Sequence, residues 1–288
     1  MPKSVVVTGA SSGIGLVTVL ELAAAGYDVI GTVRSAAKAA LVQQAADEKG
    51  VQVRTVELDV DDAASTEAGF VRVAELTDGK LWAVVNNAGY AQAGAVEDVS
   101  DERVRAQLET NLLAPIRIAR LVLPGMRQRG EGRIVNVSSV AGRLSTPLMG
   151  WYAASKHALE AVTDALRMEV EADGIRVILV EPGMFGTDIW SAAQAGGLPT
   201  PTTARYAAAY ARTEAISAQA KRLPDPVWVA RTIRVALSNP LPMARYVVGA
   251  DAVGGILAET LVPTAVTDYV KAAAVGLRSL PVKLPFLR

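Results

Sequence analysis

The sequence predicts an α/β fold in which a doubly wound, parallel, seven-stranded sheet carries helices on both faces. Short runs of β-branched residues alternate with longer alanine-rich stretches, and several of these runs are apolar without polar alternation. Uninterrupted apolar strands are typical of parallel sheets covered on both faces, and strand–helix alternation predicts right-handed crossover units. A chain of 288 residues, 51% of them hydrophobic, is long enough for one core, so we expect a single domain over residues 1–288.

Each expected strand is a short run in which Val, Ile, Leu or Thr predominates. In chain order these runs are Val5–Thr8, Val29–Val33, Val51–Leu58, Leu81–Asn86, Arg133–Ser138, Arg176–Val180 and Arg245–Val248. Helices are expected between the strands, over residues 13–25, 35–49, 63–77, 101–129, 151–172 and 225–238. In open sheets of this kind, ligands bind at the carboxyl ends of the strands. Residues that follow the strands are therefore the candidates for a functional site.

Residues 184–226 interrupt this alternation after the sixth strand. They contain the Gly196-Gly197 pair, and the stretch Ala204–Arg222 within them has the pattern of an amphipathic helix. A long insertion at the carboxyl edge of a sheet predicts a small helical lid over a substrate; an ordinary surface excursion is the alternative. Residues 254–288 are a C-terminal extension that mixes apolar runs with prolines, and packing on the site or on another subunit are both open.

Composition excludes several classes of protein. The formal net charge is zero and the pI is about 6.6, whereas a nucleic-acid-binding surface needs a basic excess. The chain has no cysteine and one histidine, His157, so disulfides and thiolate or multi-histidine metal sites are excluded and no metal is expected. The first strand begins almost at the initiator and no apolar stretch reaches about 18 residues. We expect a cytoplasmic protein without a membrane span.

A glycine-rich turn, Thr8–Gly15, joins the first strand to the first helix. Glycines at positions 9, 13 and 15 permit a tight turn, a close approach of the backbone to a pyrophosphate, and close packing of helix on strand. The phosphates would lie at the positive N-terminus of the helix. The spacing differs from GxGxxG, and a simple strand–helix turn is the alternative. Its position on the first strand–helix unit favours nucleotide binding.

The end of the second strand distinguishes the two nicotinamide dinucleotides. A carboxylate here usually binds the ribose 2′-hydroxyl of NAD, but the strand ends with Val33-Arg34 and no acid. A charge-assisted contact from Arg34 to a 2′-phosphate favours NADP(H); NAD(H) is the alternative if Arg34 is only a solvated charge. Asp59, after the third strand, is a candidate acceptor for the adenine amino group, with a turn or capping role as the alternative.

A tyrosine and a lysine four residues apart, Tyr152 and Lys156, lie on one face of an expected helix. A tyrosine has an ordinary pKa of about 10, and a neighbouring cation lowers it by stabilising the phenolate. Such a pair alone is weak evidence, because many solvated helices contain one. Ser139 lies thirteen residues before Tyr152, at the end of the fifth strand, and Asn111 lies inside the long expected helix 101–129.

These motifs occur together in the order found in the classical short-chain dehydrogenase/reductase family, which the chain resembles over roughly residues 4–251. The motifs are the TGxxxGIG turn, the NNAG sequence Asn86–Gly89, the serine thirteen residues before YxxxK, and the PGxxxT sequence Pro182–Thr187. The resemblance implies a Rossmann-like fold and an oxidoreductase that uses NADP or NAD to interconvert an alcohol and a ketone or aldehyde. It also implies a homodimer or homotetramer formed through the two long helices.

The resemblance implies catalytic roles for four residues. Tyr152 would be the general acid in ketone reduction and the base in alcohol oxidation. Lys156 would bind the nicotinamide ribose and lower the pKa of Tyr152, and Ser139 would hydrogen-bond the substrate oxygen. Asn111 would hold a water that links Lys156 to solvent; stabilisation of a helix kink by its side-chain amide is the alternative.

The resemblance further implies the residues that contact the cofactor. Those of the glycine turn would surround the pyrophosphate, those of NNAG would lie near the adenosine ribose and the nicotinamide half, and those after Pro182 would hold the carboxamide. The whole set is Gly9, Ser11, Ser12, Gly13, Ile14, Gly15, Arg34, Asp59, Val60, Asn87, Ala88, Gly89, Tyr152, Lys156, Pro182, Gly183 and Thr187.

The substrate is less well determined. Apolar residues of the lid segment and of the loop before Tyr152, among them Leu148, Trp190, Tyr206 and Tyr210, favour a hydrophobic alcohol or ketone; packing of the lid on the domain is the alternative. The chain is also similar to the hydroxysteroid-dehydrogenase-like subgroup, whose substrates vary. A non-catalytic NADP-binding sensor or scaffold is the alternative function, but such proteins usually lose catalytic residues that are intact in this sequence.

Overall fold

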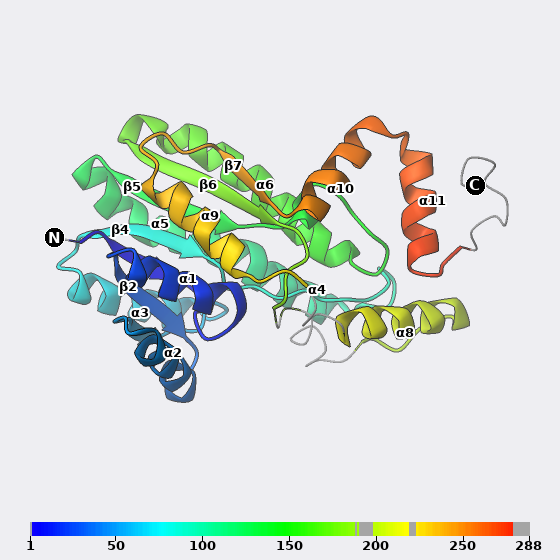
Figure 1. Cartoon of the computed structure of the whole chain (residues 1–288), viewed down its shortest axis with the longest axis horizontal. Coiled ribbons are helices and arrows are strands. Elements are labelled where there is room, and N and C mark those ends of the chain that lie inside the picture. Colours follow the sequence, from blue (N-terminus) through cyan, green and yellow to red (C-terminus); the bar gives the residue numbers. More distant parts are fainter. Residues whose placement is uncertain (1, 188, 190–197, 219–222, 279–288) are drawn as a thin grey trace.

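The computed structural model describes residues 2–187, 189, 198–218 and 223–278. Within these residues seven strands form one sheet in the order β3-β2-β1-β4-β5-β6-β7, and each neighbouring pair is parallel (Figure 1). The strands are β1 (Ser4–Val7), β2 (Asp28–Val33), β3 (Arg54–Glu57), β4 (Leu81–Asn86), β5 (Gly132–Val137), β6 (Ile175–Pro182) and β7 (Arg245–Val248). The strand order reverses between β1 and β4, which confirms the expected doubly wound, Rossmann-like sheet.

Helices connect the strands and cover both faces. They are α1 (Gly13–Ala24), α2 (Ala36–Lys49), α3 (Ala63–Leu76), α4 (Asp101–Leu108), α5 (Ala114–Arg129), α6 (Gly150–Val170), α8 (Ala204–Ala218), α9 (Val227–Ser238), α10 (Ala250–Leu261) and α11 (Thr264–Ala274). Shorter turns are the π-turn η1 (Glu109–Leu113) and the 3₁₀ turns η2 (Val140–Gly142) and η3 (Glu171–Asp173). Local chemistry starts several helices: the Asp62 carboxylate, for example, accepts a hydrogen bond from Ser65 N and caps α3.

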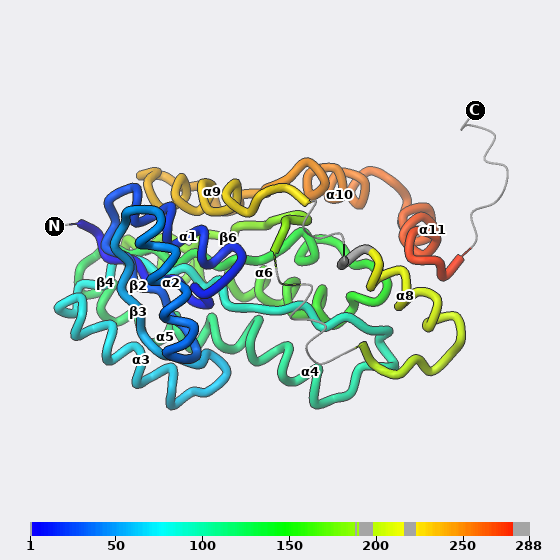
Figure 2. The backbone as a smooth tube through the Cα atoms, turned by 60° about the horizontal axis from the view of Figure 1, so that its bottom comes forward, coloured from blue at the N-terminus to red at the C-terminus, as the bar shows by residue number. Residues whose placement is uncertain are grey.

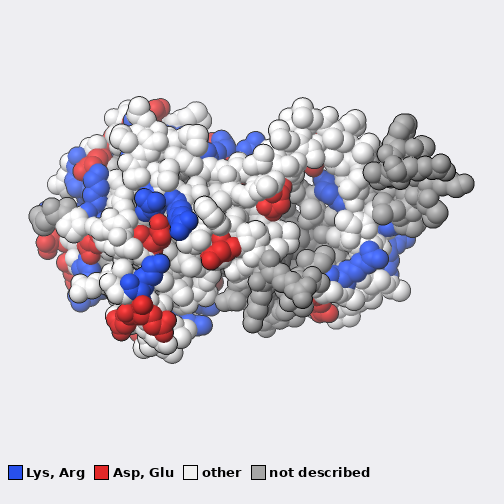
Figure 3. Space-filling model, viewed as in Figure 1, with Lys and Arg blue, Asp and Glu red and all other residues white. Residues whose placement is uncertain are grey.

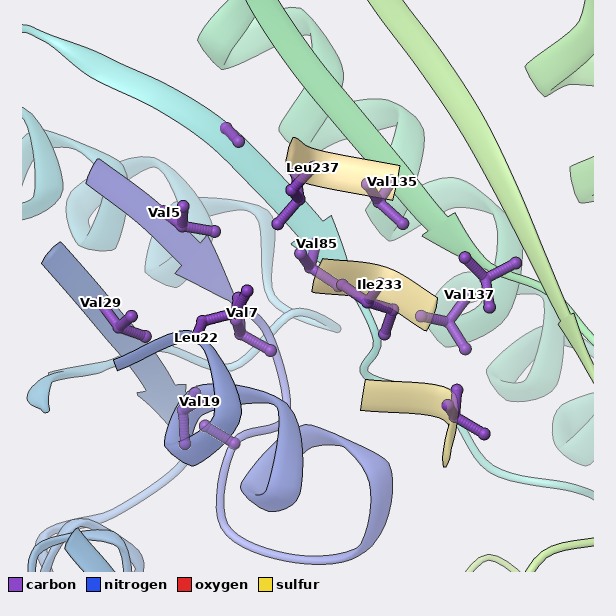
Figure 4. Packing of buried hydrophobic residues seen from close by; sticks show 14 of the residues in the cluster. Val5, Val7, Val19, Leu22, Val29, Val85, Val135, Val137, Ile233 and Leu237 are labelled. Atoms are coloured by element: carbon purple, nitrogen blue, oxygen red, sulfur yellow. The ribbon is translucent and has the colours of Figure 1, made fainter. Parts of the chain in front are cut away.

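Side chains alternate along β1, so that successive residues enter different cores. Val5 lies in a cluster with Leu22 of α1 and Ile233 of α9 (Figure 4). Val6 lies in a second cluster with Ile118 of α5, on the other face of the sheet. Figure 2 shows α9 and α3 on opposite sides of the strands. Because both faces are covered, the strands are apolar throughout their length, as the sequence indicated.

The helix expected over residues 101–129 is interrupted in the middle. α4 ends at Leu108, the π-turn η1 follows, and α5 begins at Ala114. The Asn111 side chain in this turn bonds to the backbone of Tyr90 instead of facing solvent. An inserted turn changes the apolar periodicity very little, so the sequence predicted one helix where the structure has two.

The structure differs from the sequence-based expectation in two further places. The strand expected over Val51–Leu58 is confined to β3, because this edge strand pairs only with Ile30–Val33 of β2 among the described residues. Helices α10 and α11 were not expected at all. α10 buries only one residue, Ala252, so its sequence lacks the buried apolar face that periodicity detects.

Helices α8, α10 and α11 lie beyond the carboxyl ends of the central strands, at the right of Figure 1. α8 occupies most of the helix expected over Ala204–Arg222; residues 219–222 lie outside the described part of the chain. A Cβ placed on Gly255 of α10 would lie 2.9 Å from Leu144 Cδ2, so α10 packs against the loop that follows η2. The ligand-binding edge of the sheet is therefore bordered by helices from the C-terminal part of the chain.

The surface and the helices agree with the composition. The sequence has equal numbers of acidic and basic residues, and on the face shown in Figure 3 their side chains are interspersed. No described helix is both long enough and apolar enough to cross a membrane. The residues that the structure describes contain no group of three or more His, Cys, Asp or Glu side chains arranged to hold a metal ion.

Candidate active site

Tyr152, Lys156 and Ser139 come together at the carboxyl end of β5. α6 carries Tyr152 and Lys156 one turn apart, and Ser139 follows β5 and caps η2. The Ser139 side chain lies close enough to Tyr152 to lower the pKa of its phenol, and Ser139 Oγ accepts a hydrogen bond from Ala141 N at 3.1 Å. Each of the three residues is less than a tenth exposed. The structure thus assembles this expected trio in a site with little access to bulk water.

The Lys156 ammonium is buried behind Tyr152. Its Nζ donates a hydrogen bond to the Val137 carbonyl at 2.9 Å and lies 6.0 Å from the centre of the Tyr152 ring. Burial lowers the pKa of Lys156 to about 8, while the negative charge of Glu160, one turn further along α6, acts in the opposite direction. The charge of Lys156 therefore changes within a pH range in which enzymes commonly work.

Tyr152 has a raised pKa. Burial of the phenol raises the pKa above its usual value, and the neighbouring Ser139 side chain opposes this change. In this protein the loss of hydration is thus the larger effect on the phenol. A lowering of the Tyr152 pKa by Lys156 stays a prediction.

Asn111 is fully buried in the π-turn η1. Its Oδ1 accepts a hydrogen bond from Tyr90 N at 3.2 Å, and its Nδ2 donates to Tyr90 O at 3.0 Å and to Ser155 Oγ at 3.1 Å. Ser155 Oγ donates in turn to the Tyr152 carbonyl at 2.7 Å. Asn111 therefore stabilises the helix interruption and is also joined to α6 beside Tyr152.

The glycine turn forms a cradle in front of α1. Gly9 and Gly13 have φ angles of +66° and +52°, which L side chains rarely adopt. A Cβ on Gly15 would collide with the Gly9 carbonyl and lie 2.5 Å from Asn87 Nδ2. The Ser12 side chain makes no capping hydrogen bond, so the first amides of α1 are not satisfied by their N-cap. This geometry fits the diphosphate of a dinucleotide.

Thr8 and Asn87 join the glycine turn to the end of β4. Thr8 Oγ1 accepts hydrogen bonds from Asn87 N and Ala88 N, both at 3.0 Å. Asn87 Nδ2 donates to Thr8 O at 2.9 Å and to Gly9 O at 3.3 Å. Asn87 thus fixes the turn, a role that the sequence analysis did not assign. The feature of the sequence that indicates this role is Thr8, which places a hydroxyl at the end of an apolar run.

The residues expected at the adenosine end lie apart from Tyr152, Lys156 and Ser139, at the ends of β2 and β3. Arg34 is exposed, and its positive charge acts on the Asp61 carboxylate, whose pKa is raised by burial. Asp59 Oδ1 accepts a hydrogen bond from Asp61 N at 3.1 Å, which is the turn role considered as the alternative. Val60 is buried, and its carbonyl accepts a hydrogen bond from Arg117 at 2.9 Å.

The loop after β6 closes the other side of the cradle. A Cβ on Gly13 would lie 3.3 Å from the Thr187 Cβ, so this loop meets the glycine turn. The Pro182 carbonyl accepts a hydrogen bond from Ser139 Oγ at 3.5 Å. Asp251 Oδ2 accepts a hydrogen bond from Met184 N at 2.7 Å. A Cβ placed on Gly183 would lie 2.3 Å from the same oxygen, so Gly183 has no room for a side chain. Asp251 was not expected, because nothing in its local sequence links it to a loop 67 residues away.

The lid residues mostly pack on the domain. Leu148 and Tyr210 form a small buried cluster that Tyr206 also contacts. The Tyr210 hydroxyl donates to Asp98 Oδ2 at 2.5 Å, and burial together with this carboxylate raises the pKa of Tyr210 to about 12. These side chains therefore pack the lid on the domain, which was the alternative to lining a pocket for a hydrophobic substrate. Trp190 lies outside the described residues.

Comparison with known proteins agrees with this architecture. The family model described as "short chain dehydrogenase" matches residues 3–209. An NADPH-dependent 3-dehydrocapnine reductase from Ornithobacterium rhinotracheale is 32% identical over 271 residues, which are 92% of this chain and 94% of that protein.

Two solved structures are similar over most of the chain. A short-chain dehydrogenase from Streptomyces avermitilis has a TM-score of 0.76 and 31% identity, covering 95% of this chain and 97% of that one. An alcohol dehydrogenase from Thermococcus sibiricus, solved with 5-hydroxy-NADP, has a TM-score of 0.70 and 25% identity, covering 86% and 96% of the two chains. With its matching motifs, sheet order and buried Tyr–Lys–Ser trio, this chain belongs to the short-chain dehydrogenase family of oxidoreductases.

Proposed function

We propose that this chain is an NADP(H)-dependent oxidoreductase acting on CH–OH donors, which interconverts an alcohol and a ketone or aldehyde. One observation carries the proposal: the buried Tyr152 phenol lies beside Ser139, with the Lys156 ammonium 6.0 Å from the centre of its ring. A phenol placed between a second hydroxyl and a cation is suited to give a proton to a substrate oxygen or to take one from it.

Two considerations favour NADP(H) over NAD(H). Arg34 is exposed at the end of β2, directly before Ser35, the N-cap of α2, so a 2′-phosphate there would meet a guanidinium and the positive end of a helix. The names of two similar proteins point the same way, because the O. rhinotracheale reductase is called NADPH-dependent and the T. sibiricus enzyme was solved with 5-hydroxy-NADP. NAD(H) is the alternative if Arg34 adds nothing to cofactor affinity.

The remaining cofactor contacts follow from the shape of the cradle. The diphosphate would lie on the amides of the glycine turn, and the nicotinamide end would lie between NNAG and the loop after β6. The residues proposed to bind it, besides Arg34, Tyr152 and Lys156, are Gly9, Ser11, Ser12, Gly13, Ile14, Gly15, Asp59, Val60, Asn87, Ala88, Gly89, Pro182, Gly183 and Thr187.

The chain's own residues would orient the substrate and move its proton. When bound, the nicotinamide supplies a hydride in reduction and accepts one in oxidation. In reduction, Tyr152 donates its hydroxyl proton to the carbonyl oxygen that Ser139 holds, and in oxidation it takes that proton back. Lys156 stabilises the phenolate that remains after donation. Asn111 would position a water that returns protons toward Lys156.

We further propose a hydrophobic substrate, covered by residues 184–226 as a lid. Support comes from the apolar surroundings of Leu148 and Phe185, and from α8, which is tied through Tyr210 to Asp98. Membership of the hydroxysteroid-dehydrogenase-like subgroup, a cytoplasmic location, a single domain over residues 1–288 and a homodimer or homotetramer stay predictions.

A substrate panel tests the proposed function. NADPH consumption by the purified full chain would be followed with hydrophobic ketones and aldehydes, and NADPH and NADH affinities would be measured by titration. Turnover with at least one ketone or aldehyde, and tighter binding of NADPH than of NADH, are expected. Tight NADPH binding without turnover on any member of a broad panel would favour the alternative, a non-catalytic NADP-binding sensor or scaffold.

A further inference from the structure

Two glutamates that the proposed reaction does not use are buried behind the catalytic trio. Glu160 lies on α6, one turn after Lys156, and Glu181 is the residue before Pro182 in β6. Glu181 is fully buried and Glu160 is 5% exposed. Carboxylates are almost never buried to this extent unless they are paired. Their partners therefore indicate what they do.

Two arginines hold the glutamates together. Arg245 Nε lies 3.1 Å from Glu160 Oε2 and 3.1 Å from Glu181 Oε1, so one nitrogen contacts both carboxylates. Arg143 lies 3.6 Å from Glu181 Oε2. Arg245 also pairs with Asp164, which is more exposed than either glutamate. The two carboxylates are thus fixed side by side between α6, β6 and β7.

Glu181 accepts a proton more readily than an ordinary glutamate does. Burial, followed by the charge of Glu160, raises the pKa of Glu181 to about 7. Two neighbouring carboxylates that are shielded from water do not both ionise easily. Oε1 of Glu160 and both carboxylate oxygens of Glu181 receive no hydrogen bond from the described part of the protein, so the contacts of Glu181 with Arg143 and Arg245 are ion pairs.

Both glutamates adjoin the catalytic residues. A Cβ on Gly142 would lie 2.8 Å from Ser138 Oγ and 2.9 Å from Glu160 Cγ, so the turn that follows Ser139 rests on Glu160. The charge of Glu160 also acts on Lys156. The pair therefore lies in contact with the backbone that carries Ser139 and within electrostatic reach of the Lys156 ammonium.

We propose that Glu160, held beside Glu181 by Arg245, is the positioning residue that keeps the Lys156 ammonium charged. The Val137 carbonyl is a neutral acceptor, and a buried ammonium needs a negative charge nearby to remain protonated. This inference rests on the proposed role of Tyr152, because a charged Lys156 matters for the phenolate. The charged groups that face the pair or its arginines are Lys156, Asp164, Arg143, Arg245 and Arg167.

Titration of Lys156 by NMR tests this directly. The full chain would be labelled with carbon-13 at the lysine ε carbon, and the Lys156 signal would be assigned by its absence in Lys156→Met. Glu160→Gln should lower the pH at the midpoint of the Lys156 titration by about half a unit or more, because the negative charge of Glu160 is lost. The charge of Glu160 acts on Lys156 and no such effect of Glu181 is found, so Glu181→Gln should shift this midpoint less than Glu160→Gln does.

Two further variants make the result specific. Asp164→Asn removes another partner of Arg245 without removing a charge beside Lys156, so its midpoint should match wild type. Glu160→Asp keeps the charge but withdraws it by one methylene, and should give an intermediate midpoint; it also serves if Glu160→Gln does not fold. An unchanged midpoint in both Glu160 variants, or an equal shift in Asp164→Asn, would overturn the proposal.

Kinetics separate this inference from the proposed function. The fall of kcat/KM for ketone reduction at alkaline pH should move to lower pH in Glu160→Gln and stay in place in Asp164→Asn. Turnover whose pH profile is the same in Glu160→Gln and wild type would refute the inference alone. An NMR shift in a wild-type protein that reduces no ketone would refute the proposed function and leave the electrostatic link between Glu160 and Lys156 intact.

Discussion

The Lys156 ammonium lies 6.0 Å from the centre of the Tyr152 ring, one turn further along the buried side of α6. Both residues are nearly inaccessible to solvent. A charge acts strongly on its neighbours where water is excluded, so protonation of Lys156 should decide how readily Tyr152 gives up its proton. The pH dependence of turnover is therefore the property that reports on this pair.

We predict that kcat/KM for ketone reduction falls as the pH rises above about 8. Burial lowers the pKa of Lys156 to about 8, so its positive charge is present below that pH and is lost above it. Without the charge, the phenolate formed when Tyr152 donates its proton is less stable. A pH–rate profile from pH 6 to 10 measures this effect.

Lys156→Arg provides the control for this prediction. A guanidinium stays charged throughout the range, so whatever activity remains should show no alkaline fall near pH 8. A wild-type profile that is flat up to pH 10, or an Arg variant with the same fall as wild type, would assign the pH dependence to another group.

Arg34→Ala should weaken NADPH binding about ten- to a hundredfold and leave NADH binding nearly unchanged, because only NADPH carries the 2′-phosphate. Dissociation constants from fluorescence titration at fixed ionic strength measure both. Arg72→Ala on α3, an exposed arginine paired with Glu75, is the matched control and should change neither constant. Equal losses for NADPH and NADH in Arg34→Ala would show that Arg34 does not read the 2′-phosphate.

Gly15→Ala should weaken the binding of both dinucleotides by about tenfold or more, because a Cβ there meets the Gly9 carbonyl and the Asn87 amide. The turn must move, and its amides then no longer fit the diphosphate. Gly254→Ala in α10 is the control, since among the described residues its added Cβ would meet nothing within 4 Å outside its own stretch of helix. It should bind cofactor as wild type does. Wild-type affinity in Gly15→Ala would contradict the cradle as the diphosphate site.

Glu181→Gln should change how stability depends on pH. Burial raises the pKa of Glu181 from 4.5 to about 7, so the folded protein binds more protons than the unfolded chain between these values and loses stability as the pH rises through them. Glu181→Gln has no carboxyl group to titrate, so its stability does not fall in this way. At about 1.4 kcal/mol per pKa unit, it should gain about 1–3 kcal/mol relative to wild type between pH 4.5 and 7.

Urea unfolding at several pH values measures this difference. Glu171→Gln, an exposed glutamate beside Arg176, is the control and should follow the wild-type curve. Parallel curves for Glu181→Gln and wild type would mean that Glu181 is ionised in the folded protein throughout the range.

The sheet could be predicted from the sequence because each strand carries its own signal. Val5 and Val6 enter different cores, and this two-sided burial makes the strand apolar in every position. The break at Asn111 was considered only as the alternative role of that residue, since a π-turn changes the helical period by only one residue. α10 was missed because most of its side chains are not buried.

The site could be predicted where its residues belong to local motifs. Tyr152 and Lys156 share one helix turn, and the glycine turn is continuous in sequence. Glu160, Glu181 and Arg245 come from three separate elements, and only the fold brings their side chains within 3.1 Å of one nitrogen. Asp251 likewise reaches the loop after β6 through tertiary structure alone. Contacts of this kind leave no pattern in a single sequence.

Whether Tyr152 is the proton donor is tested by comparing Tyr152→Phe with wild type. Both proteins would be titrated with NADPH and then assayed with the best ketone or aldehyde of the panel. The phenyl ring preserves packing but has no proton to donate, so the account predicts unchanged NADPH affinity and a loss of kcat of about a hundredfold or more. A Phe variant that binds NADPH and turns over as fast as wild type would contradict the account, because Tyr152 would then not be the proton donor.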